Sequence, residues 1–155
     1  MSGIINSAGS PSGIIGQTEL DYEEGTWTPI VDLKSGFSNQ ATYVRQEGKY
    51  VKIGDLCTVG CEFTINQINH GLGSHISGLP FIVDNSPNAI WAAPVQFFSA
   101  LIINVVFVAL RAQNNTNQIY FAHTTTAAGA VVNGGVLMGN SSRFAFSMTY
   151  QVKKI

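Results

Sequence analysis

Two cysteines and two histidines occur at spacings that could hold a metal ion. Cys57 and Cys61 are four positions apart, and His70 and His75 are five apart. Thiolate and imidazole are ligands that zinc prefers in proteins. The cysteines, however, follow a strand-like alternation of apolar and polar residues, which would hold them about 13 Å apart on one face. Neither one zinc ion nor one disulfide spans that distance, so we expect two small buried side chains and no metal site.

Carboxylates could also carry chemistry, since glycoside hydrolysis needs two of them facing one another across a groove. Outside the run at residues 21–24, the acids are scattered without a paired spacing, although pairs can converge in three dimensions: Glu19, Asp32, Glu47, Asp55, Glu62 and Asp84. The sequence contains no Gly-x-Ser-x-Gly motif and no phosphate-binding glycine loop. We therefore predict that the protein is not an enzyme and binds no cofactor. A small cell-wall glycan hydrolase stays as a remote alternative.

The histidines are expected to be solvated or hydrogen-bonded locally. His70 and His75 flank a short Gly-containing segment, and His123 ends a β-like run. None of them belongs to a nucleophile motif. At a symmetry axis, stacked histidines could instead bind an ion or respond to pH, and the sequence leaves that open.

Alternation of apolar and polar residues indicates β-strands from Trp27 onward. The strongest examples are residues 57–65 and 144–152, and shorter candidates lie at 42–44, 50–53, 75–77, 90–95, 101–112, 118–123 and 135–138. Turn-forming residues separate these segments, and none of them has the sustained period of a long helix. Many short strands predict an all-β fold, an antiparallel β-sandwich or jelly-roll-like knob.

Composition limits the classes of function further. The chain has 155 residues, of which 45% are hydrophobic and only 11% are charged, with a net charge of −1. One domain of this length can bury a substantial core. So little charge favours a surface shared with copies of the chain or with a larger assembly. Nucleic acid is not expected as a partner, because the Lys and Arg residues do not gather into a basic patch.

No segment predicts membrane insertion. The longest apolar stretch, Phe97 to Leu110, is interrupted by Ser99 and Asn104 and is too short to span a bilayer as a helix. The first 16 residues lack the charged start and apolar run of a secretory signal. Two cysteines do not make a disulfide scaffold, so we expect synthesis in a reducing cytoplasm.

The N-terminal segment contains two Gly-Ile-Ile units separated by small turn-forming residues. They contribute four isoleucines that have no periodic context: Ile4, Ile5, Ile14 and Ile15. Such a segment cannot form a core of its own. It is either a disordered tail or an extended arm whose isoleucines dock into a partner. We favour the arm, because four exposed isoleucines suit a free tail poorly.

The segment from Leu20 to Pro29 reads Leu-Asp-Tyr-Glu-Glu-Gly-Thr-Trp-Thr-Pro. It resembles a segment that recurs in bacteriophage tail-fibre and related virion proteins, where it introduces a terminal β-sandwich domain. Two further stretches are similar to that family: an aromatic and Lys-Ile-Gly strand pair at residues 41–56, and an Ile-Ser-Gly-Leu-Pro-Phe turn at residues 76–81. The chain departs from the family in having a single Asp21 where an Asp pair is common, and in having no shaft or coiled coil before the motif.

The resemblance implies a non-enzymatic structural protein on the outer surface of the virion. It implies a homotrimeric β-knob at residues 26–155 and an extended docking arm at residues 1–25. The favoured function is a tail-fibre-type knob displayed for host-surface attachment, and the absent shaft keeps a capsid decoration or cement protein as the alternative. The implied partners are copies of the chain, other virion proteins bound through the arm, and a host-surface glycan. Synthesis then takes place in the host cytoplasm.

Four residues are expected at the junction of arm and knob or in an interface between protomers: Tyr22, Glu23, Glu24 and Trp27. The sequence leaves three settings open for Trp27, namely the core of its own domain, which we favour, a protomer interface, or a stack on a ligand. Its indole N–H needs a partner when buried. The candidate glycan contacts are polar loops at residues 71–74, 85–88, 114–117 and 127–134.

Overall fold

The computed structural model describes residues 21–33, 41–68, 73–86, 91–126, 132–133 and 137–154. In these residues the chain is built from strands: β1 (Tyr22–Trp27), β2 (Ile30–Leu33), β3 (Ala41–Ile53), β4 (Leu56–Ile68), β5 (Gly73–Ser77), β6 (Ala92–Ser99), β7 (Phe107–Ala112), β8 (Gln118–Thr124), β9 (Val132–Asn133) and β10 (Arg143–Gln151). None of the described segments is a helix of the length and apolarity that a membrane crossing requires. The all-β prediction is confirmed.

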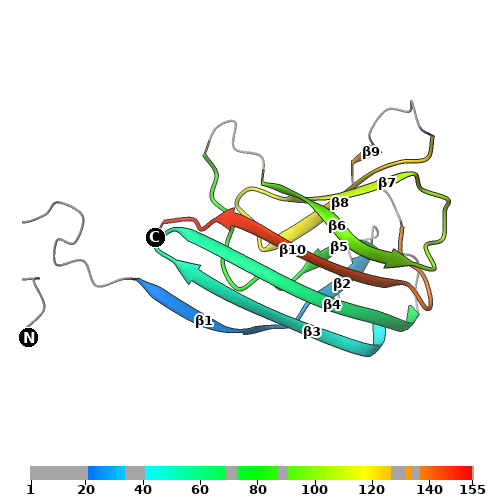
Figure 1. The fold of residues 1–155 in the computed structure, drawn as a ribbon, viewed down its shortest axis with the longest axis horizontal. Coiled ribbons are helices and arrows are strands. Elements are labelled where there is room, and N and C mark those ends of the chain that lie inside the picture. Colours follow the sequence, from blue (N-terminus) through cyan, green and yellow to red (C-terminus); the bar gives the residue numbers. More distant parts are fainter. Residues whose placement is uncertain are drawn as a thin grey trace, which may run out of the picture.

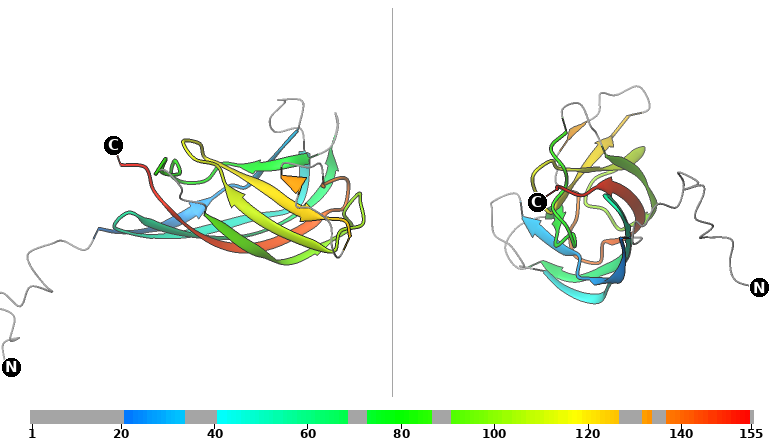
Figure 2. Two further views of the ribbon diagram at one scale, coloured as in Figure 1. Left: turned by 90° about the horizontal axis from the view of Figure 1, so that it is seen from above. Right: turned by 90° about the vertical axis from the view of Figure 1, so that its left-hand side faces the viewer.

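The strands form a curled antiparallel sheet in the order β1-β3-β4-β10-β6-β7-β8-β5-β2, with β9 added to β8. β6 pairs with β10 on one side and with β7 on the other, so it belongs to both halves of the curl. Figures 1 and 2 show these halves facing each other as two layers. The sandwich-like architecture expected from the strand pattern is thus present as one sheet folded over on itself.

β1 and β2 lie at opposite ends of this order although they follow one another in the sequence. The chain crosses between the layers at Thr28 and Pro29, and a proline cannot donate to a ladder. The seam between the layers is closed by side chains. Tyr43 Oη accepts a hydrogen bond from the Val31 N–H at 2.7 Å, and Gln46 Nε2 donates to the Pro29 carbonyl at 2.8 Å.

The core lies between the two layers. The alternation at residues 57–65 and 144–152 is confirmed, because its apolar members point inward while the residues between them face outward. Phe144 links the layers: its ring stacks on Phe63 at 5.7 Å and packs against Phe121 at 5.0 Å. Each such fully buried side chain contributes about 1.5–3 kcal/mol.

Two strand expectations were wrong in extent. The candidates at 42–44 and 50–53 are parts of one 13-residue strand, β3, which forms a hairpin with β4 around Gly54 and Asp55. The candidate at 101–112 is a strand only from Phe107 onward. Ala100 has a φ of 53°, which turns the chain out of the sheet after β6. Apolar content alone does not reveal such a break.

Candidate functional site

Outward-pointing residues of neighbouring strands line up in rows, because the antiparallel registers continue from strand to strand. We call this surface the outer face. The first row, which we call the apolar row, holds Tyr22, Ile53, Leu56 and Gln151, and the second holds Glu24, Val51, Thr58 and Thr149. The third row holds Thr26, Lys49, Gly60 and Ser147. The fourth row holds Glu47, Glu62, Ala145 and Phe97. The first three rows span β1, β3, β4 and β10, and the fourth spans β3, β4, β10 and β6.

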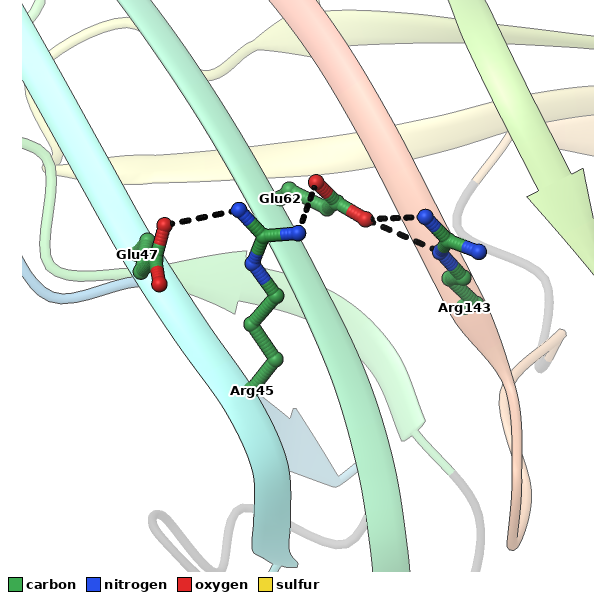
Figure 3. A network of polar contacts seen from close by, with 4 residues as sticks. All are labelled: Arg45, Glu47, Glu62 and Arg143. Atoms are coloured by element: carbon green, nitrogen blue, oxygen red, sulfur yellow. Dashed lines mark hydrogen bonds and ion pairs between the residues drawn. The ribbon is translucent and has the colours of Figure 1, made fainter.

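A network of charged groups crosses the fourth row (Figure 3). Arg45 donates to Glu47 at 2.9 Å and forms an ion pair with Glu62 at 2.8 Å. Arg143 binds the other oxygen of Glu62 through Nε at 2.9 Å and through a terminal nitrogen. The Arg143 guanidinium also lies 4.9 Å from the centre of the Phe97 ring. Two arginines therefore hold two carboxylates and one aromatic ring in a fixed arrangement on the sheet.

The network brings together two acids that sequence spacing had left apart. Glu47 and Glu62 are directly opposite each other in the β3–β4 hairpin. A signal existed, because a two-residue turn at Gly54 and Asp55 fixes the register of the whole hairpin. A glycoside hydrolase needs one carboxyl group with a raised pKa to act as general acid. Arg45 does the reverse, since its hydrogen bond and charge lower the pKa of Glu47. Glu47 is therefore poorly suited to act as a general acid.

A shallow groove of about 520 Å³ lies next to the network on the outer face. Thr58 lines it, and the Thr58 hydroxyl is hydrogen-bonded at 2.8 Å to the hydroxyl of Thr149 on β10. The residues that line the groove include one acidic and one basic side chain: Glu24, Gly25, Thr26, Lys49, Tyr50, Val51, Thr58 and Gly60. The groove offers hydroxyls and small side chains for close contact, and Glu24 is the one carboxylate among its lining residues.

The three stretches that resemble tail-fibre proteins meet at one corner of the fold. Gly25 lies against the Tyr50 ring, where an added Cβ would come within 2.9 Å of it. Tyr50 in turn packs edge-on against Phe81 at 5.5 Å. Gly78, at a φ of 91°, lies against the Thr28 carbonyl, where only glycine leaves enough room. The motif residues thus build the crossing from β1 to β2, which is a structural task.

The expected junction residues divide between the two faces of β1. Tyr22 and Glu24 are exposed on the outer face, and their side chains are hydrogen-bonded at 2.6 Å. Glu23 is on the other face and accepts a hydrogen bond from Tyr50 Oη at 2.6 Å. Trp27 is buried in the core of its own chain with 6% of its surface exposed. Its indole nitrogen has no hydrogen-bond partner among the described residues.

Neither a family model nor a curated protein matches the sequence. The fold has a counterpart in a phage tailspike. The chain is similar to the crystal structure of the Dettilon tailspike protein, with a TM-score of 0.62 and 17% sequence identity. The match covers 84% of this chain and 24% of the tailspike chain, so the chain spans much less than the tailspike's length. At this identity the likeness establishes the all-β fold, and it does not by itself assign a function.

Several expected site residues lie outside the described residues, among them the arm isoleucines Ile4, Ile5, Ile14 and Ile15, and His70. The candidate loop at 114–117 is described, and it packs against the segment after β5. The Val83 N–H donates to the Thr116 carbonyl at 2.8 Å, and the Asn115 N–H donates to the Val83 carbonyl at 3.0 Å. Of the other candidate loops, residues 71–72, 87–88, 127–131 and 134 fall outside the description.

The cysteines and the described histidines do not converge on one site. Cys57 is fully buried, and Cys61, on the same side of β4, is half-buried. Burial raises the pKa of both thiols, so they are protonated at neutral pH. His75 lies 3.6 Å from buried Asp32 and stacks on Tyr120 at 5.0 Å. No group of three or more potential metal ligands occurs in the described part of the chain.

Proposed function

We propose that the chain is a structural protein of a bacteriophage virion, a β-knob anchored by its N-terminal arm and displayed on the outer surface for host attachment. The observation that carries this proposal is the similarity of 84% of the chain to part of a tailspike. The resemblance of residues 20–29 to tail-fibre segments supports it separately. The described residues of this segment include the crossing that joins the two layers. A homotrimer is part of the proposal.

The positions of the two ends of the described chain support an anchored orientation. The Asp21 carbonyl accepts a hydrogen bond from the Gly54 N–H at 2.8 Å, and Lys154 pairs with Asp55 at 2.8 Å. Both ends therefore meet at the β3–β4 turn, at the left of Figure 1. An arm that leaves at Asp21 departs from this end of the knob, and the proposed anchor holds the knob there.

The opposite end is then the one presented to the host. It lies where β6 ends and β7 begins, at the right of Figure 1, and it exposes large hydrophobic side chains: Phe98, Ile102, Val106 and Phe107. Exposed aromatic and aliphatic groups beside neutral polar residues suit weak contacts that gain strength from several copies. The loop at 114–117, proposed from sequence as a glycan contact, is at the anchored end instead, since Lys153 Nζ donates to Asn115 Oδ1 at 3.0 Å.

We also propose that the protein acts without catalysis. The two carboxylates that the fold places opposite each other, Glu47 and Glu62, are held by arginines. The lowered pKa of Glu47 opposes a general-acid role. Attachment through binding energy alone requires no such group.

Labelling of intact virions with an antibody to the knob tests the proposal. We expect label on the tail. Label spread over the capsid would favour the decoration protein, and virions without label would reject a virion component altogether. Deleting residues 1–20 should abolish incorporation into particles while the knob stays folded; full incorporation of the deleted chain would reject the anchor.

The orientation has a separate test in host adsorption. Phe107→Ala should reduce the adsorption of phage to its host, because Phe107 is at the presented end. Ile82→Ala is the matched control: the two side chains are 48% and 49% exposed, and Ile82 is at the anchored end, where its carbonyl accepts from Lys153. Equal adsorption of wild type and Phe107→Ala phage would contradict the orientation.

A further inference from the structure

We infer that the outer face is the surface through which copies of the chain associate, with the apolar row at the centre of the contact. The inference rests on the self-association in the proposed function and names the surface that mediates it. The segment at residues 21–29 contributes to both sides of β1: Gly25 and Trp27 face the core side, whereas Tyr22 and Glu24 lie on the outer face.

The apolar row exposes three large side chains side by side. Tyr22, Ile53 and Leu56 are 50%, 52% and 49% exposed. The register pairs Tyr22 with Ile53 and Ile53 with Leu56, so they are direct cross-strand neighbours. Val51, also exposed, extends the patch into the second row. Monomeric proteins rarely leave contiguous apolar patches of this kind in water, whereas protein interfaces are built around them.

The middle rows allow a second sheet to approach closely. Gly60 has no side chain, and an added Cβ there would meet nothing nearer than 3.9 Å. Its neighbours toward β10 in the second and third rows are hydroxyl side chains, namely Thr58, Thr149 and Ser147, and Lys49 is its partner on β3. A shallow hollow lies beside the apolar row and is lined by residues of β1, β3 and β4, among which Thr26, Thr58 and Gly60 are small. A protruding side chain of another copy, such as Tyr22 or Leu56, can enter that hollow.

The charges of the outer face favour a copy of the same chain as the occupant. The face carries three acidic and three basic side chains: Glu24, Glu47, Glu62, Arg45, Lys49 and Arg143. Its net charge is therefore zero, so two copies can meet here without net repulsion. The network around Glu62 also pairs four of these groups within one chain, which lowers the cost of covering them. A strongly anionic or cationic partner would find no complementary field.

The position of the apolar row suits an anchored oligomer. Tyr22 directly follows Asp21, where the proposed arm leaves the knob. Copies joined through this row would bring their arms together at one place. Several arms that act together bind a particle more tightly than one arm, because the later contacts become intramolecular.

Static light scattering of the full chain tests the inference. Wild type should have a mass of several chains at micromolar concentration, and Leu56→Glu should shift the dissociation constant upward by roughly thirtyfold or more. The matched control is Phe107→Glu, because Phe107 is 48% exposed and lies on β7, which pairs with β8 in the layer opposite β1, β3 and β4; the mass of this variant should equal that of wild type. A monomeric wild type, or a Leu56→Glu variant with unchanged association, would overturn the inference.

Cross-linking provides a second readout that does not depend on destabilising the contact. Ser147→Cys places a thiol in the third row, and a short bifunctional thiol reagent should join copies through it. Ala92→Cys is exposed on the part of β6 that pairs with β7 and no longer with β10, and it should give only monomer. The native thiols interfere little, since burial raises the pKa of Cys57 and Cys61. Cross-linking that is equal for both variants, or absent from both, contradicts the inference.

The outcome is separable from that of the proposed function. Virions without label would reject the virion role whatever the oligomeric state. A labelled virion with a monomeric knob would reject only the association. A Leu56→Glu variant that keeps its mass but loses adsorption to the host would overturn the inference in favour of a host-binding face.

Discussion

Gly48 lies directly beneath the Trp27 indole. An added Cβ at this position would stand 2.6 Å from both Trp27 Nε1 and the Trp27 carbonyl oxygen. Trp27 is almost fully buried, so the indole cannot swing away without disturbing the core. The pairing of a glycine with the tryptophan across β1 and β3 therefore fixes the depth at which the motif tryptophan enters the fold.

Gly48→Ala should destabilise the knob by about 1–3 kcal/mol, because a methyl group is forced into a filled space. Urea unfolding followed by tryptophan fluorescence measures this change. Gly60→Ala is the matched control in the same hairpin. An added Cβ at Gly60 would come no closer than 3.9 Å to another atom, the Phe146 carbonyl oxygen. It should change stability by less than about 0.5 kcal/mol. Equal effects of the two substitutions would contradict the close packing.

His75 stands between two opposing influences. Burial lowers its pKa from the ordinary value, and the negative charge of nearby Asp32 raises it in part. The folded protein thus binds a proton at His75 less readily than the unfolded chain. Stability from this group is present above the unfolded pKa of 6.5 and is lost as pH falls from there through the lowered folded pKa.

Replacing His75 with Gln should flatten this dependence. We expect the wild type to lose more unfolding free energy than the variant when pH falls from about 7.5 to about 5. Urea midpoints of both proteins at the two pH values give the comparison, and the difference between them removes the contribution of other titrating groups. A steeper loss in His75→Gln would mean that Asp32 outweighs burial.

At the scale of elements, the seam between β2 and β3 is the part of the fold that is not closed by a ladder. Among the described residues, β2 forms a ladder only with β5, and two side-chain hydrogen bonds link its other side to β3. Val31 is fully buried, so its N–H depends on Tyr43 Oη for a partner. The two side-chain hydrogen bonds therefore leave fewer unpaired backbone N–H and C=O groups at the edge of β2.

Tyr43→Phe removes the acceptor and keeps the ring. We expect a loss of about 1–3 kcal/mol, because a buried N–H is left without a partner. Hydrogen exchange should speed up at Val31 and along β2 more than at β4. Exchange that changes equally throughout the knob would show that the seam opens only with global unfolding.

Much of the strand pattern follows from the sequence, and its pairing does not. Residues 57–65 and 144–152 are predictable because each has one buried and one exposed face. The meeting of Glu47 with Glu62 could be inferred only by fixing the hairpin register at Gly54. The contact of Phe97 with Arg143 could not be inferred, since it follows from the register between β6 and β10, which are far apart in the sequence and are not joined by a short turn. Tertiary contacts decide such pairings.

At the scale of the molecule, the described knob contains a complete core between its layers. Deleting residues 1–20 should therefore leave the thermal midpoint within about 2 °C of the full chain. Differential scanning calorimetry at matched concentration makes the comparison. A large drop in the midpoint would mean that residues 1–20 contribute to the core, and the boundary between arm and knob would then lie before Asp21.

The antiparallel pairing of β1 with β3 has a mechanical consequence. β1 starts at the end where the proposed arm leaves and runs alongside β3 for six residue pairs. Its hydrogen bonds are perpendicular to the strand. A pull on the arm, such as a particle tethered to a surface would exert, acts along β1 and loads those bonds together in shear. Breaking the hydrogen bonds between β1 and β3 one at a time would need a force perpendicular to β1. The knob therefore resists a pull along β1 best, and this is the direction in which an anchored particle would pull.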